Sequence, residues 1–167
     1  SSLEDDYAGP ADLLSRTNVV LLHLKQKNWR RMMTAQAFEI DCAQGNFRFA
    51  NAGHCFPYLV AADGASARSL EIIGFPLGSA SKKAYEECSG KLEPGMTLVC
   101  YSDGIVEAVN SQDEVFGYSR FERLLVDAWS EDLEVYWQNI MAEYNRWAVN
   151  QDDDLTFLLA RIEGGGE

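Results

Sequence analysis

The spacing of apolar residues along the chain changes twice, from a helical period to an alternating one and back. The first periodic segment runs from Pro10 to Lys27, with leucines at positions 13, 14, 21 and 24 and lysines near its end. Proline suits the first turn of a helix, where its missing N–H would have no partner, and cations suit the last turn. The pattern therefore predicts an amphipathic helix.

Alternation of apolar and polar residues dominates the next part of the chain and predicts strands. Thr34–Asp41 and Asn46–Ala52 flank Gly45, and Phe47 and Phe49 alternate with polar neighbours, which indicates an antiparallel hairpin. Further strands are expected at Phe56–Ala61, ending in an Asp63-Gly64 turn, and at Ala84–Ser89 and Thr97–Tyr101, separated by a Pro94-Gly95 turn.

After a loop holding Phe116-Gly117 the period becomes about 3.6 residues, which predicts helices. These are expected over Tyr118–Trp129 and Leu133–Val149, and the aromatic face of the second is interpreted as core. Its members are Leu133, Trp137, Ile140, Met141, Tyr144 and Trp147. The apolar run Leu155–Ile162 suggests a buried strand. Together the elements predict one α+β domain over residues 1–167, a mostly antiparallel sheet with helices packed on it.

Composition narrows the classes of partner. Hydrophobic residues make up 47% of the 167 residues, charged residues 24%, and the net charge is −12 without a basic stripe. No apolar run approaches the roughly 18 residues of a membrane span. Nucleic acid and membrane insertion are therefore not expected. The acidity suits a site that concentrates divalent cations, although it equally suits simple solubility.

The cysteines and histidines carry little chemistry of their own. Four cysteines occur without a Cys-x-x-Cys pair and both histidines stand alone, so neither a zinc site nor a disulfide framework is expected, and a reducing cytoplasm is the default. His54 and Cys55 are adjacent, but neighbours in an extended segment point to opposite faces. A structural role for His54 is favoured over a Cys–His nucleophilic pair.

Two acidic positions lie at the ends of expected strands. Asp103 follows the strand within LVCYSDGIVEAVN (98–110), where Asp-Gly predicts either a two-residue hairpin turn or a carboxylate presented to a metal ion. Three aspartates at 152–154 precede the last strand and form either a solvated loop or further ligands. Hard cations such as Mg²⁺ and Mn²⁺ take carboxylates and water. The residues alone leave both alternatives open.

Five phrases in order carry a family resemblance: NAGH (51–54), GFPLG (74–78), LEPGMTLVCYSDGIVEAVN (92–110), VFG (115–117) and DDLT (153–156). Together they resemble the SpoIIE-type serine/threonine phosphatases, the bacterial branch of the metal-dependent PPM (protein phosphatase 2C-like) family. The match runs from about Pro10 to Arg161. It implies an antiparallel β-sandwich flanked by helices, with an α-β-β-α layering.

The resemblance also implies a reaction. Two Mn²⁺ or Mg²⁺ ions would bridge a water that attacks the phosphorus of phosphoserine or phosphothreonine in line, so no protein nucleophile is needed. The implied substrate is a phosphorylated bacterial regulatory protein, often an anti-anti-sigma factor, in a cytoplasmic signalling system. A homodimer is also compatible with the family.

The resemblance assigns roles to individual residues. It implies that Asp103 and Asp153 are the catalytic metal ligands, and that Gly104 lets the backbone approach the metal site closely. Four further residues are expected to shape the site without binding metal: Glu107, Asn110, Asp154 and His54. On this basis Asp103 is expected to be a ligand and not a hairpin residue.

One departure from the family pattern modifies these expectations. The family draws further aspartates from an N-terminal Gly-Asp-Tyr-Tyr-Asp-like phrase and an Asp…Gly-His-Gly phrase, and neither occurs here; Asp5 and Asp6 do not fit them. The chain is therefore expected to be the C-terminal portion of such a domain, with a weak metal site and an exposed sheet edge. The alternatives are a non-catalytic partner-binding module of the same fold and, less favoured, a stand-alone metal-binding regulatory domain.

Overall fold

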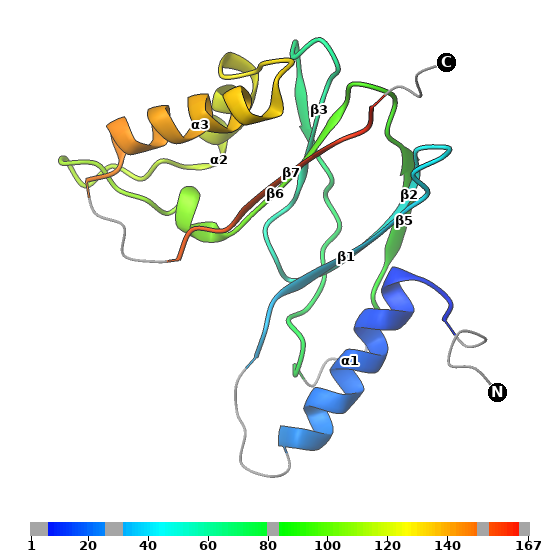
Figure 1. The fold of residues 1–167 in the computed structure, drawn as a ribbon. Coiled ribbons are helices and arrows are strands. Elements are labelled where there is room, and N and C mark those ends of the chain that lie inside the picture. Colours follow the sequence, from blue (N-terminus) through cyan, green and yellow to red (C-terminus); the bar gives the residue numbers. More distant parts are fainter. Residues whose placement is uncertain (1–6, 26–31, 80–83, 150–153, 164–167) are drawn as a thin grey trace. The chain divides into compact units, whose positions relative to one another are not determined.

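The computed structural model describes residues 7–25, 32–79, 84–149 and 154–163, which form two compact units (Figure 1). Unit 1 comprises Ser1–Phe56 and Glu71–Lys91, and unit 2 comprises Pro57–Leu70 and Leu92–Glu167. The elements in chain order are α1 (Pro10–Lys25), β1 (Ala35–Ile40), β2 (Asn46–Ala52), β3 (Tyr58–Val60), β4 (Ala67–Ser69), β5 (Glu87–Lys91), β6 (Thr97–Tyr101), the 3-10 turn η2 (Asp103–Ile105), α2 (Tyr118–Asp127), α3 (Leu133–Trp147) and β7 (Phe157–Arg161).

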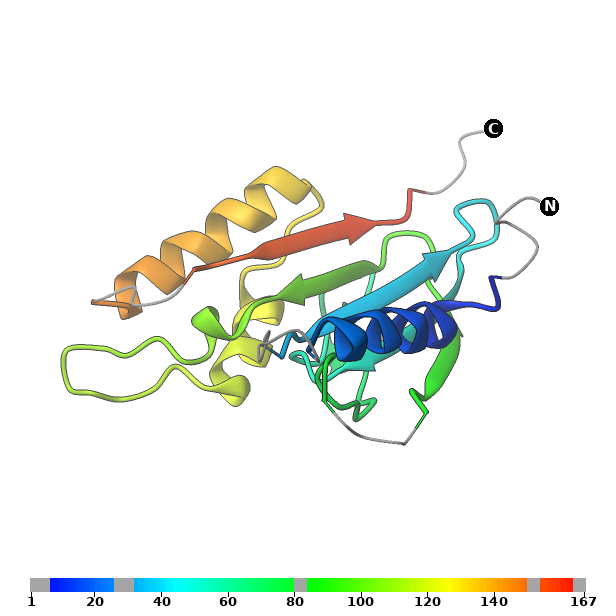
Figure 2. The same cartoon turned by 90° about the horizontal axis from the view of Figure 1, so that it is seen from below.

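Unit 1 consists of an antiparallel sheet with the order β1-β2-β5, and α1 lies along it (Figures 1 and 2). The hairpin between β1 and β2 pairs Ala35 with Ala52 and Ile40 with Phe47. Alternate positions of the two strands carry small alanines, so the helix can approach the sheet closely. Leu14 of α1 fills this layer together with Ala37, Ala50, Ala52 and Leu77.

The GFPLG segment closes the unit-1 core against α1. Leu77 is almost fully buried in the same cluster as Leu14, and its backbone pairs with that of Met33. The next amide, that of Gly78, donates to Oδ1 of the buried Asn18 at 2.6 Å. This bond satisfies a polar group of the helix that would otherwise be buried at a cost.

Unit 2 consists of an antiparallel sheet with the order β4-β3-β6-β7, on which α2 and α3 pack. An aromatic cluster joins the helices to the sheet. Phe121 of α2 lies 4.4 Å from Tyr101 and 6.0 Å from Phe157, measured between ring centroids, and Trp137 of α3 lies 5.2 Å from Phe157. Edge-on and offset rings of this kind stabilise a core beyond the area that they bury.

Hydrogen bonds define the start of α3 and join α3 to α2. Asp132 caps α3 by accepting from the amides of Glu134 and Val135. The buried hydroxyl of Tyr136 donates to the carbonyl oxygen of Leu125 at 2.6 Å. Because burial raises the pKa of Tyr136, the phenol stays protonated and remains a donor.

The α+β class, with helices packed on antiparallel sheets, is confirmed, as is the hairpin around Gly45. The predicted core face of α3 is confirmed in part: Ile140 and Tyr144 are buried, the other four predicted residues are half-buried, and Tyr136 is a buried residue that the pattern missed. The structure contains a short strand, β4, that the alternation of apolar and polar residues did not predict. Strand β5 lies at Glu87–Lys91, shifted from the expected Ala84–Ser89. None of the helices in the described ranges has the length and apolar character that a bilayer crossing requires.

The expectation of a buried last strand was wrong. β7 has one strand neighbour among the described residues, β6, and stands at the end of its sheet. One face of β7 packs under α3, while Leu158 on the other face is 51% exposed. A run of apolar residues indicates a strand, but the number of its neighbours depends on the topology.

We predict that Leu14→Ala lowers the free energy of unfolding by about 2–5 kcal/mol, because it opens a cavity in the unit-1 core. Leu13 precedes it on α1 but is 48% exposed, against 4% for Leu14, so Leu13→Ala should change the free energy by less than about 0.5 kcal/mol. Urea denaturation of both variants measures the difference. Equal losses would contradict the assignment of Leu14 to the core.

Candidate functional site

Asp103 lies immediately beyond the buried strand β6, where it begins the 3-10 turn η2. Its backbone oxygen accepts hydrogen bonds from the amides of Val106 and Glu107, both at 2.9 Å. Gly104 and Ile105 are buried under the turn, whereas Asp103 itself is exposed. The two-residue hairpin left open by the sequence does not occur, and the carboxylate is presented on a rigid turn.

Ser102 joins this turn to the segment that precedes β7. Its Oγ donates to the backbone oxygen of Asp154 at 3.0 Å and accepts from the amide of Thr156 at 2.9 Å. Its own amide donates to the carbonyl oxygen of Thr156 at 2.9 Å. These bonds extend the β6–β7 ladder, which ends at Tyr101 opposite Phe157. They bring the exposed Asp154 beside the turn of Asp103, while Asp153 lies outside the described residues.

The underside of the turn is held by helix α3. The buried hydroxyl of Tyr144 donates to the carbonyl oxygen of Gly104 at 3.4 Å. Burial raises the pKa of Tyr144, so the phenol stays protonated and can only act here as a donor. Sequence reasoning placed Tyr144 in the core without this role and missed Ser102. The signal for Ser102 was its position directly before the Asp-Gly pair.

The loop after the turn is organised by Asn110. Its Oδ1 accepts from the amides of Gln112 and Glu114 at 2.9 and 3.0 Å, and its Nδ2 donates to the Glu114 carboxylate at 2.8 Å. Glu107 is exposed, and its amide is one of the donors to Asp103. The Asn110 side chain therefore shapes the loop at residues 110–114, whereas Glu107 contacts Asp103 through its backbone amide.

His54 lies in unit 1, within a turn built by Asn51. The buried Asn51 side chain accepts from the His54 amide at 2.9 Å and donates to the carbonyl oxygens of His54 and Ile72 at 2.9 and 3.0 Å. Gly53 has a φ of 73°, a left-handed conformation that glycine adopts without strain. The ring Nδ1 of His54 lies 3.2 Å from Oγ1 of Thr34, so the imidazole has a partner of its own.

The oxygen atoms near the Asp103 turn are of the kind that hard cations take as ligands. Asp103 and Asp154 offer exposed carboxylates or carbonyl oxygens, which Mn²⁺ and Mg²⁺ prefer. Within the described ranges, however, no three His, Cys, Asp or Glu side chains gather where they could share one ion. A complete coordination shell would therefore need Asp153, water or further groups.

Known proteins of similar sequence include a family and a curated relative. The family model described as stage II sporulation protein E (SpoIIE) matches residues 1–163. Protein IcfG from Synechocystis sp. is 29% identical over 122 residues, which cover 71% of this chain and 19% of that protein. The chain therefore spans about a fifth of this curated relative.

Two solved structures share the fold. The SiaA-PP2C domain of Pseudomonas aeruginosa superposes with a TM-score of 0.80 at 23% identity, covering 93% of this chain and 61% of that one. The manganese-presoaked phosphatase domain of SpoIIE from Bacillus subtilis has a TM-score of 0.61 at 20% identity, covering 80% of this chain and 58% of that one. The antiparallel sheets and packed helices described above are thus those of a PP2C-like fold.

We predict that Ser102→Ala releases the segment before β7, because the Thr156 amide loses its acceptor and the Asp154 carbonyl its donor. Hydrogen exchange at the Thr156 amide should accelerate, and the free energy of unfolding should fall by about 1–2 kcal/mol. Ser119→Ala, at an exposed position of α2, is the matched control. Unchanged exchange at Thr156 would show that the Ser102 hydroxyl does not hold this segment.

Proposed function

Because the chain belongs to the SpoIIE family, we propose that it is a domain of a metal-dependent protein phosphatase. The proposed reaction is hydrolysis of phosphoserine or phosphothreonine on a bacterial regulatory protein. The observation that carries the proposal is the hydrogen bonding of Ser102. It holds the exposed Asp103 turn next to the segment that begins at Asp154.

We assign Asp103 and Asp153 as ligands of Mn²⁺ or Mg²⁺, with Gly104 allowing close approach of the backbone. A bound pair of such ions would activate and orient a water and offset charge on the phosphoryl oxygens. The chain's own contribution is rigidity: β6, the Tyr144 bond and the Ser102 bonds hold the backbone that carries Asp103. Rigid placement matters because a misplaced ligand loses most of its effect on rate.

The proposed reaction needs no protein nucleophile, and the thiol of Cys100 in strand β6 is poorly suited to be one. Cys100 lies two residues before Ser102, and burial raises the pKa of its thiol to about 12. At neutral pH the thiolate, which is the nucleophilic form, is therefore scarce. We accordingly propose attack by water and no covalent enzyme intermediate.

The substrate that we propose is an anti-anti-sigma-like phosphoprotein, which places the domain in the cytoplasm. This assignment rests on the family pattern and extends the family membership. Self-association into a homodimer stays a prediction.

A second candidate is a non-catalytic module of the same fold that binds a partner. The observation that favours it is that the described residues do not bring three metal-binding side chains together. Such a module would keep the fold while binding Mn²⁺ weakly or not at all. The two candidates differ in what manganese does to the chain.

We predict that millimolar Mn²⁺ raises the melting temperature of the chain and that Asp103→Asn abolishes the increase. A ligand at roughly 100-fold excess over its Kd stabilises by about 2.7 kcal/mol, provided that it binds only the native state. Glu107→Gln is the matched control, because Glu107 is an exposed carboxylate of the same loop that we do not assign to the metal. Differential scanning fluorimetry measures the shifts.

Hydrolysis of a phosphoserine peptide in Mn²⁺ then separates the candidates. Activity that Asp103→Asn removes and Glu107→Gln keeps is the expected result for the phosphatase. A cooperative melt with no manganese shift and no hydrolysis would reject it in favour of the non-catalytic module. Loss of the shift in Glu107→Gln as well would show that the ligands are wrongly assigned.

A further inference from the structure

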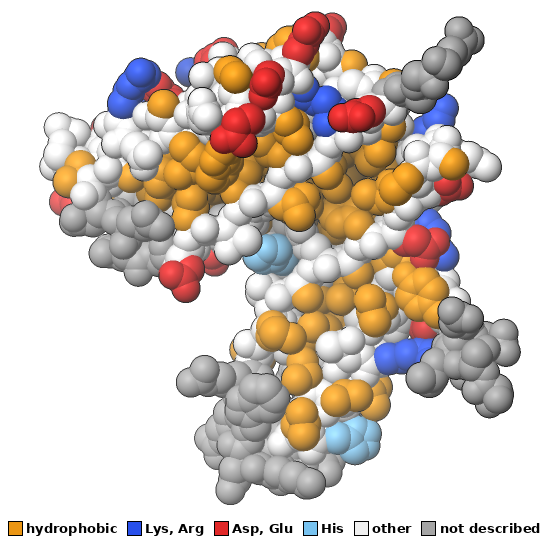
Figure 3. All heavy atoms as spheres, in the orientation of Figure 1, with side chains coloured by type: hydrophobic (Ala, Val, Ile, Leu, Met, Phe, Trp, Pro, Cys, Tyr) orange, Lys and Arg blue, Asp and Glu red, His pale blue; other side chains and the backbone are white. Residues whose placement is uncertain are grey.

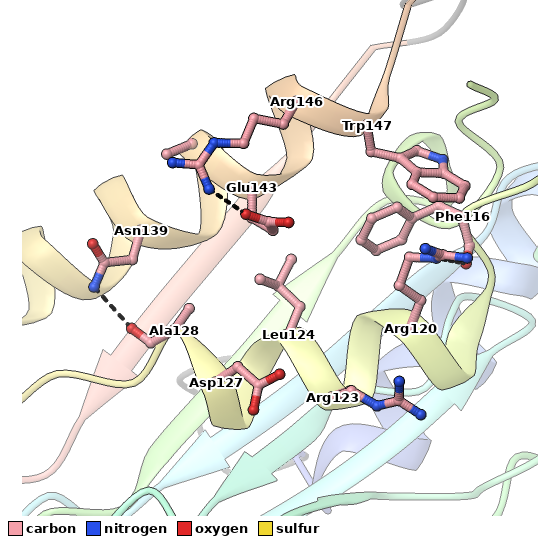
Figure 4. Close-up of a pocket in the computed structure, with 11 residues that line it drawn as sticks. Phe116, Arg120, Arg123, Leu124, Asp127, Ala128, Asn139, Glu143, Arg146 and Trp147 are labelled. Carbon is pink, nitrogen blue, oxygen red and sulfur yellow. Dashed lines mark hydrogen bonds and ion pairs between the residues drawn. The ribbon is translucent and has the colours of Figure 1, made fainter. Parts of the chain in front are cut away.

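A groove runs between α2 and α3 of unit 2, away from the sheet face that the helices cover. Its volume is about 530 Å³. Its lining combines basic, aromatic, acidic and apolar side chains, and includes Phe116, Arg120, Arg123, Asn139, Arg146 and Trp147 (Figure 4). Arginine next to tryptophan is the combination that most often supplies the affinity of protein interfaces.

Arg120 is held flat against the aromatic wall of the groove. Its guanidinium carbon lies 3.5 Å from the ring centroid of Trp147 and 5.8 Å from that of Phe116, and its Nε donates to the carbonyl oxygen of Phe116 at 3.3 Å. Stacking uses the face of the guanidinium, so its in-plane N–H groups stay available. No carboxylate among the described residues pairs with Arg120.

Arg123 and Arg146, the other two cations of the groove, can also pair with an external anion. Arg123, one turn along α2, is exposed and makes no ion pair or hydrogen bond with a described residue. Arg146 pairs with Glu143 at 2.6 Å, but both side chains are largely exposed, so the pair is weak and can be exchanged. With Asp127 as the other acid, the groove carries three cations and two anions in a chain whose net charge is −12.

Arg161 shows what a structural arginine looks like in the same unit. Its Nε donates to Thr97 Oγ1 at 2.8 Å, and its Nη1 donates to the carbonyl oxygen of Glu131. The protein itself therefore supplies acceptors for two of the three guanidinium nitrogens of Arg161, while the third, Nη2, is buried without a partner among the described residues. Among the residues that the structure describes, Arg120 and Arg123 have no acceptor beyond the single Nε bond of Arg120, which leaves their charge for an external anion.

We infer that the α2–α3 groove binds an acidic segment of a protein partner. Carboxylates of that segment pair with Arg120 and Arg123, and an apolar side chain lies against the partly exposed Trp147. Asn139 donates its amide to the Ala128 carbonyl at 3.0 Å, which leaves its side-chain oxygen for a backbone N–H of the segment. A uniformly anionic nucleic-acid backbone fits less well, because Asp127 and Glu143 interrupt the basic lining.

The groove is connected to the Asp103 turn through the backbone. The amides of Phe116 and Gly117 donate to the carbonyl oxygens of Ala108 and Val106 at 2.8 and 2.9 Å, so one loop forms both the groove wall and the turn. A partner in the groove is therefore held close to that turn. The inference itself does not rest on the proposed phosphatase activity, since binding is measured without turnover.

The test uses the 167-residue chain and a short fluorescein-labelled peptide in which glutamates flank a leucine. Fluorescence anisotropy at low salt should show saturable binding that weakens as salt is added. Arg123→Glu should lower the affinity roughly tenfold, through loss of one pairing and gain of one repulsion. Arg68→Glu makes the same charge change at an exposed position of β4 outside the groove, and should change the affinity less than about twofold.

The second variant, Arg120→Gln, removes the other paired cation and should also lower the affinity. Circular dichroism checks that each variant folds. A peptide with glutamine in place of glutamate should fail to bind. The inference is overturned if the acidic peptide does not bind the folded chain, or if Arg68→Glu weakens binding as much as Arg123→Glu. Preferential, arginine-dependent binding of a labelled single-stranded oligonucleotide would overturn it too.

Discussion

The pairing of β6 with β7 is the constraint on which the site depends. Because the strands are antiparallel, the end of β6 and the start of β7 meet at one edge, and Ser102 continues the ladder past Tyr101 and Phe157. Two acidic segments that are far apart in sequence therefore become neighbours. The Ser102 hydroxyl and backbone amides and carbonyls fix this arrangement.

The helices of unit 2 support the same edge from below. The Tyr144 bond to Gly104 ties α3 to the turn, and the aromatic cluster around Phe121 ties α2 to the sheet. Helix α2 also presents Arg120 and Arg123 to the groove that it lines together with α3. On the face drawn in Figure 3, Lys and Arg side chains of the described residues are scattered and form no continuous stripe.

Periodicity and motif order predicted most elements and the position of Asp103. Ser102 and the hydrogen-bonding role of Tyr144 escaped prediction, because the role of a hydroxyl depends on its partner and those partners lie 52 and 40 positions away. β4 is too short for alternation to stand out. The exposure of the Leu158 side chain could not be predicted, because an apolar run does not indicate how many strands pair with the strand that it forms. The groove depends on how two helices meet, which no local pattern encodes.

The central claim is that Asp103 and the segment before β7 share one metal ion. Paramagnetic broadening by Mn²⁺ in the amide NMR spectrum of the chain tests it most directly, because the effect falls steeply with distance from the ion. The account predicts that substoichiometric Mn²⁺ first broadens the amides of Asp103, Gly104 and Asp154. Broadening that begins instead at the amides of Glu39 and Glu87, whose carboxylates pair with Arg48, would contradict the account if the amides of the Asp103 turn are unaffected.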